Sequence, residues 1–220
     1  MNFRQEIARY VTGNLTTDQL PDIGVKGLEE GLDTPSLCIL AGLDKNENPF
    51  QIEQFFKLTL EELKIELPDR RQAALEYASA ILDEILVGKN EIIQGTKEIY
   101  CNAIDSYDFF SETKDFCYDS IGFEAVYGLF VTYNDLLEAD HPWQMGKTNK
   151  QLMANVKDEL WEELKKWKKK LKTVHNKNYM SIGVSARITK FAARKSGFGV
   201  RQESNPQSPT ANSSVRYGKF

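Results

Sequence analysis

The chain has few of the residues on which recognisable sites usually depend. Its 220 residues include two histidines and three widely spaced cysteines, Cys38, Cys101 and Cys117. No Cys-x-x-Cys pair occurs, and Glu-x-x-His occurs once, at Glu138 to His141, whereas a di-metal helical bundle needs two such elements, so the patterns of zinc knuckles and di-metal helical bundles are missing. We therefore predict no metal and no cofactor. We expect the cysteines to be free and buried, because cysteine behaves as a small hydrophobic side chain.

Long apolar runs are also missing. The longest run of apolar or small residues extends from Leu37 to Leu43, whereas a transmembrane helix needs about 18 residues or more. The segment from Met1 to Glu6 is charged where a signal peptide requires an apolar region. The sequence therefore predicts no membrane association and a cytoplasmic location.

Motifs of nucleotide binding and nucleophilic catalysis are incomplete. Residues 146–148 read Gly-Lys-Thr, as at the end of a phosphate-binding loop, but the required glycine five residues before Gly146 is replaced by His141. Neither Gly-x-Ser-x-Gly nor Gly-x-Gly-x-x-Gly occurs. We therefore assign no catalytic and no cofactor-binding residue. An enzyme with an unrecognised site remains a hypothesis, and it ranks third, after the two functions given at the end of this subsection.

Helix signals recur throughout the first 172 residues. Thr34-Pro35, Asn48-Pro49 and Asp69 each place a capping side chain before a helical pattern. Residues 126–133 also fit a strand through their β-branched and aromatic side chains, but a helix fits better. We predict an all-α fold, an irregular multi-helix bundle without a sheet. The expected helices cover about residues 3–11, 20–32, 36–43, 50–63, 70–87, 90–104, 123–139 and 149–172.

Apolar stripes identify the expected core. Apolar residues recur at helical spacing along residues 70–87 and again along 149–172, as on helices with one face in the core. The apolar run at 36–43 should also be buried. The residues expected at the centre of the two stripes are Leu82, Ile85, Leu160 and Leu164.

The charge is distributed unevenly along the chain. Its formal net charge is −4, but residues 1–155 hold 13 basic and 27 acidic side chains, whereas residues 173–220 hold eight basic and one acidic. An acidic body can attract a basic partner. A basic end is typical of arms that contact nucleic acid or membrane, and equally of solvated extensions.

Acidic residues cluster at helical spacing. We expect clusters such as Glu61, Glu62 and Glu66 to lie on solvated helix faces rather than to hold a metal ion. On the last helix, Glu162 and Lys166 have the favoured order for an (i, i+4) ion pair.

Two tryptophans lie outside the centres of the apolar stripes. Trp143 follows His141-Pro142 in a turn, where a tryptophan either anchors a partner or closes a core. Trp161 lies at the edge of its stripe between Lys157 and Lys165. It either widens the core-facing stripe or makes a cation–π contact.

The composition changes after residue 172. Residues 202–216 are rich in serine, proline and asparagine and lack periodicity, which is typical of disorder. We predict one acidic all-helical domain at 1–172 and a basic, mostly disordered tail at 173–220. The abrupt change also fits a shifted reading frame. The candidate phosphate contacts in the tail are Arg187, Lys190, Arg194, Lys195 and Arg201.

Three segments resemble a known family. Glu6 to Gly13, Leu20 to Ile23 and Asp33 to Leu43 resemble the start of a family of small helical bacterial proteins of unknown function. The resemblance covers about residues 3–170 and excludes the tail. It implies a cytoplasmic bacterial helical domain, and it supplies no catalytic or binding residue.

Two functions lead our hypotheses. The first is a non-catalytic protein-interaction or regulatory module with a basic protein partner, a class that includes immunity- and antitoxin-like roles. The alternative is association with nucleic acid through the basic tail, against which the acidic body argues.

Overall fold

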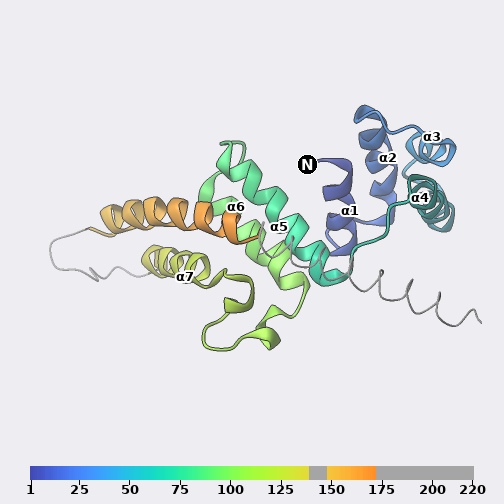
Figure 1. Ribbon diagram of the computed structural model, residues 1–220. Coiled ribbons are helices and arrows are strands. Elements are labelled where there is room, and N and C mark those ends of the chain that lie inside the picture. The colour runs from blue at the N-terminus through green and yellow to red at the C-terminus, as the bar shows by residue number, and fades with distance from the viewer. Residues whose placement is uncertain (139–147, 172–220) are drawn as a thin grey trace, which may run out of the picture. The chain divides into compact units, whose positions relative to one another are not determined.

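The described part of the protein, residues 1–138 and 148–171 of a computed structural model, is helical, with no strand among these residues (Figure 1). The predicted all-α fold is thereby confirmed. None of the described helices is both long and apolar enough to cross a membrane. The tail at 173–220 lies outside the described residues, so its predicted disorder and the boundary at residue 172 stay predictions.

Short connections join the first six α-helices, and an irregular segment with three 3-10 turns, residues 104–123, precedes the seventh. A 3-10 turn (Thr17–Gln19) precedes the second helix, and a π-helical turn (Ile99–Ala103) extends the sixth. The α-helices are α1 (Phe3–Val11), α2 (Leu20–Glu29), α3 (Pro35–Gly42), α4 (Pro49–Leu63), α5 (Arg70–Leu86), α6 (Ile92–Glu98), α7 (Glu124–Glu138) and a last helix at 149–171.

The predicted helix starts at Thr34, Asn48 and Asp69 are confirmed. Each of these side chains accepts a hydrogen bond, at 2.8–3.3 Å, from a backbone N–H two or three residues further on. Such a bond satisfies an N–H group that has no partner within the helix. These starts are local, which is why the sequence alone predicts them.

Helices α1 to α4 enclose a first group of buried side chains, here called the N-terminal core. Two glycines of α2 allow close packing there. A Cβ atom on Gly24 would lie 2.8 Å from the backbone nitrogen of Ala41, and one on Gly27 would lie 3.0 Å from the ring of Phe3. The N-terminal core consists of Phe3, Ile7, Leu15, Leu20, Ile23, Leu37, Leu40, Ile52, Phe56 and Leu60.

The expectation that the whole run at 36–43 is buried is wrong. Leu37 and Leu40 are buried, but Ile39 is 45% exposed. Helix α3 packs against α2 and α4, so its outer face remains open to solvent. The face on which a residue lies decides its burial, even where nearly every residue is apolar.

The three cysteines are free but exposed, so the prediction that they are buried is wrong. Cys38 lies on the outer face of α3. Cys101 lies in the π-helical turn, whose first and last residues, Ile99 and Ala103, face inward instead. Cys117 lies in the segment before α7.

The chain from α5 onward, together with Ala8 of α1, encloses the second core. The four residues expected in the core are each at most 1% exposed, so that prediction is confirmed. Trp167 is buried in this core, and its indole N–H donates to the carbonyl oxygen of Ile121 at 3.0 Å. The second core consists of Ala8, Ala73, Ala74, Leu75, Tyr77, Ala78, Ile81, Leu82, Ile85, Ile99, Ala103, Ile104, Phe109, Tyr118, Ile121, Phe123, Val126, Leu160, Leu164, Trp167 and Leu171.

Polar anchors hold the irregular segment between the π-helical turn and α7. The guanidinium of Arg71 donates two hydrogen bonds, at 2.8 and 2.9 Å, to the carboxylate of Glu112. The carboxylate of Asp119 accepts from three backbone N–H groups at 114–116. These bonds replace the regular backbone ladder that the segment lacks.

Candidate functional site

Helix α7 and the helix at 149–171 form an antiparallel hairpin (Figure 1). The side-chain amide of Asn149 donates to the carbonyl oxygen of Leu136 at 3.2 Å, so the start of the second helix lies beside the end of the first. At the other end, the ammonium group of Lys170 lies 3.2 Å from the carboxylate of Glu124.

One flank of the helix at 149–171, here called the basic flank, faces α5 and α6. Lys168 pairs with Asp83 at 2.7 Å, and Lys157 pairs with Glu91 at 3.0 Å. The positive charge on this flank is therefore balanced within the protein.

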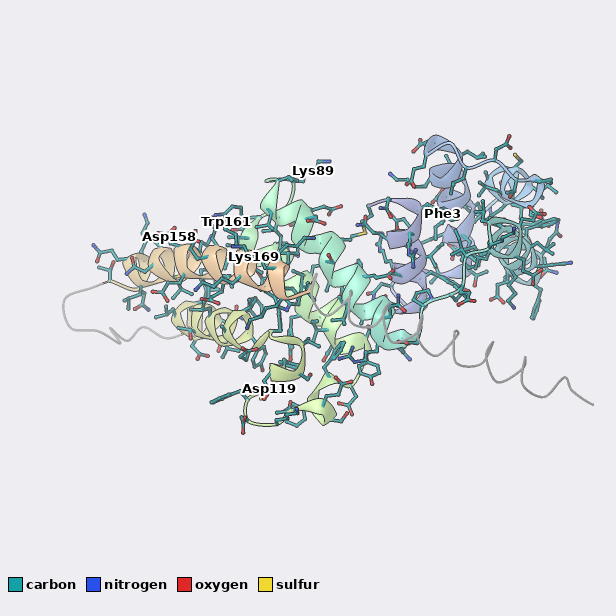
Figure 2. The ribbon with its side chains drawn as sticks, viewed as in Figure 1. Phe3, Lys89, Asp119, Asp158, Trp161 and Lys169 are labelled. Carbon is teal, nitrogen blue, oxygen red and sulfur yellow. The ribbon has the colours of Figure 1, made fainter. Side chains whose placement is uncertain are left out.

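Trp161 lies near the middle of this helix (Figure 2). The ammonium group of Lys165 lies 5.1 Å from the centre of its ring, so the predicted cation–π contact is confirmed. The partly buried ring also packs against the second core, so the alternative, a widened core-facing stripe, holds as well. A role for Trp161 in binding a partner stays a prediction.

The other flank, here called the acidic flank, carries four carboxylates that form two pairs, and the two members of each pair are about one helical turn apart. Glu162 and Glu163 pair with the lysines three positions further along, at 2.8 and 2.6 Å. Within the described residues, no ion pair involves Asp158 or Glu159. The acidic flank consists of Asp158, Glu159, Glu162 and Glu163.

The predicted pair between Glu162 and Lys166 does not form. Lys165 reaches Glu162 and Lys166 reaches Glu163, so both pairs have (i, i+3) spacing. The hydrogen bond from Lys165, followed by its charge, lowers the pKa of Glu162. The matching bond to Glu163 raises the pKa of Lys166, so Glu162 and Lys166 are both charged at neutral pH.

A groove of about 730 Å³ separates the acidic flank from α7. We call it the acidic groove. The α7 wall is mostly small and apolar, and the opposite wall is the acidic flank with one lysine. The groove thus offers negative charge beside apolar surface, an arrangement that suits cationic side chains on apolar stems. Its lining consists of Ala125, Gly128, Leu129, Thr132, Asp158, Glu159, Glu162, Glu163 and Lys166.

Other carboxylates that cluster in the sequence have structural partners instead. Glu62 accepts hydrogen bonds from both the backbone N–H and the hydroxyl of Ser36, which lowers the pKa of Glu62. Glu30 accepts from the backbone N–H of Phe3. In residues 1–138 and 148–171 no three His, Cys, Asp or Glu side chains are grouped so that they could hold a metal ion.

Most of the sequence-predicted interaction residues are not placed. Apart from Trp161, these residues lie outside the described part of the chain and their roles stay predictions. They are Trp143, Arg187, Lys190, Arg194, Lys195 and Arg201.

Sequence reasoning missed the acidic groove. The (i, i+4) spacing of Asp158 and Glu162, on the flank away from Lys157 and Lys168, is visible in the sequence. The second wall is not visible, because nothing in the sequence shows that Gly128 faces that flank.

Comparison with known proteins gave no match. No protein-family model matches the chain, and neither the curated proteins nor the solved structures include a significant match. The resemblance to a family of small helical bacterial proteins therefore stays a prediction.

Proposed function

We propose that the protein is a non-catalytic interaction module that binds a basic segment of a partner protein in the acidic groove. One observation carries the proposal: Asp158 and Glu159 line a groove, are exposed, and have no ion pair among the described residues. Immunity- and antitoxin-like roles belong to the same proposal, since such proteins act through a partner.

The charge of the groove favours a cationic partner. Its lining has four carboxylates and a single ammonium group, and two of the carboxylates, Asp158 and Glu159, have no ion pair among the described residues. Like charges held along one wall create a potential that concentrates ions of opposite sign. Because the groove is open to solvent, each new pair would contribute only about 0.2–1 kcal/mol. The apolar side chains on the α7 wall would add contacts with the stems of lysine or arginine.

The test uses the full chain and a defined probe, a fluorescein-labelled peptide of about 20 residues of lysine, leucine and alanine. Fluorescence anisotropy gives the dissociation constant. We expect the double variant Asp158→Lys/Glu159→Lys to weaken binding about tenfold or more, because it removes two attractive charges and adds two repulsive ones. High salt should weaken binding to the unmodified chain.

The matched control makes the same change of net charge at two residues outside the acidic groove. Glu29 and Glu66 are exposed and have no ion pair among the described residues. The double variant Glu29→Lys/Glu66→Lys should change the dissociation constant less than about twofold. Equal weakening by both double variants would show that only net charge matters and would overturn the proposal. Preference of the unmodified chain for a DNA duplex over the peptide would also overturn it, in favour of nucleic-acid binding.

A further inference from the structure

We infer that the basic segment binds as an amphipathic α-helix that packs into the acidic groove as a third helix beside the hairpin, with its closest approach at Gly128. The inference rests on the proposed function and adds the conformation of the partner. Three features of the groove support it: its backbone groups, its glycine and its charge spacing.

The walls of the groove offer no backbone hydrogen bonds to a partner. Both walls are helices, whose interior N–H and C=O groups bond along the helix. The hydroxyl of Thr132 on the α7 wall donates to the carbonyl oxygen of Gly128 at 2.8 Å. An extended segment would leave its own backbone groups without protein partners here, whereas a helix satisfies them internally.

Gly128 has no packing role inside the described structure. It lies in the interior of α7, where glycine weakens a helix relative to alanine. A Cβ atom added there would meet nothing within 4 Å, whereas one added to Gly24, Gly27 or Gly95 would meet another part of the protein. The open space at Gly128 lies in the groove, so it allows a partner helix to approach the α7 backbone closely.

The spacing of the groove's charges matches a helix. Asp158 and Glu162 are four residues apart, as are Glu159 and Glu163, so each pair is separated by about 6 Å along the helix axis. Lysine or arginine side chains at (i, i+4) on a partner helix have the same separation. The lining residues extend over about 10 Å of the α7 wall and about 12 Å of the opposite wall, which is about two turns of a partner helix.

The first experiment fills the groove. Gly128→Leu should weaken binding of the lysine–leucine–alanine peptide about tenfold, because the new side chain occupies the space that the partner needs. Gly42→Leu is the matched control, since Gly42 also lies in a helix and its added Cβ would also meet nothing within 4 Å. Circular dichroism of both variants should show native helix content.

The second experiment changes the probe. The same peptide with two central leucines replaced by proline keeps its length and charge but cannot form a continuous helix. We expect it to bind the unmodified chain at least about tenfold more weakly.

The results separate the two proposals. If Gly128→Leu and the proline peptide bind as tightly as their references while Asp158→Lys/Glu159→Lys still weakens binding, the helical conformation is wrong and the proposed function stands. If the charge reversal has no effect, the proposed function fails. Equal weakening by Gly42→Leu and Gly128→Leu overturns the placement of the helix at Gly128.

Discussion

The N-terminal core and the second core differ in how their closest contacts are made. In the N-terminal core, two helix backbones approach each other at Gly24, whose missing Cβ leaves room for the backbone of Ala41. In the second core, a large side chain fills the space: the ring centre of Trp167 lies 4.6 Å from that of Phe123. The first arrangement is therefore sensitive to added atoms and the second to removed atoms.

The two cores share one helix. Phe3 and Ile7 of α1 belong to the N-terminal core, whereas Ala8 belongs to the second core and α1 packs along α5. A change in either core therefore acts on a helix that the other core also needs. We expect the described residues to unfold in one cooperative transition.

The largest change in the free energy of unfolding should follow removal of the indole ring of Trp167. Trp167→Ala leaves a cavity and removes the hydrogen bond to Ile121, so the free energy of unfolding should fall by about 3–5 kcal/mol. Urea denaturation followed by circular dichroism measures the change. Trp167→Phe keeps a ring and should cost clearly less. An unchanged midpoint for Trp167→Ala would show that the second core does not depend on this side chain.

The next largest change in the free energy of unfolding should have opposite signs for alanine substitutions at Gly24 and Gly128. Gly24→Ala places a Cβ atom against the backbone of Ala41 and should lower the free energy of unfolding by about 1–3 kcal/mol. Gly128→Ala adds a methyl group in open space and should raise it by up to about 1 kcal/mol. Thermal melts of the two variants test this. Stabilisation by both substitutions would contradict the close helix contact in the N-terminal core.

A smaller effect should depend on pH. The hydrogen bonds from Arg71 lower the pKa of Glu112, so their stabilisation is present above the carboxylate's unfolded pKa and is lost as the pH falls through the folded value. Arg71→Met should reduce the free energy of unfolding by about 1 kcal/mol at pH 7 and by less at pH 3. Urea titrations at both pH values measure the difference. A constant difference would mean that Arg71 acts through packing on the ring of Phe109.

The smallest effect should come from the basic flank. Lys168→Met removes a partly exposed pair with Asp83 and should cost about 0.5 kcal/mol. A double-mutant cycle with Asp83→Asn isolates the pair energy, which should shrink in 0.5 M NaCl. A pair energy that is insensitive to salt would contradict this interpretation.

The sequence predicted those features that depend on local chemistry. The cap at Asp69 needs only the residues beside it, and the stripe containing Leu160 and Leu164 needs only helical periodicity. The exposure of Ile39 could not be predicted in this way, because it depends on which face of α3 meets other helices. The acidic groove could not be predicted for the same reason, since it forms only where α7 packs beside the helix at 149–171.

The division of charge between the two flanks of the helix at 149–171 has a kinetic consequence. Lys157 and Lys168 are paired with Glu91 and Asp83, whereas Asp158 and Glu159 have no ion pair among the described residues, so we expect these two carboxylates to produce a negative field on their side of the helix. At physiological ionic strength this field extends about 8 Å into solvent. For the basic partner proposed above, we expect this field to act before contact and to raise the association rate constant. We therefore expect salt to slow the association of that partner, whereas its dissociation rate, which the proposed packing over Gly128 would set, should change little.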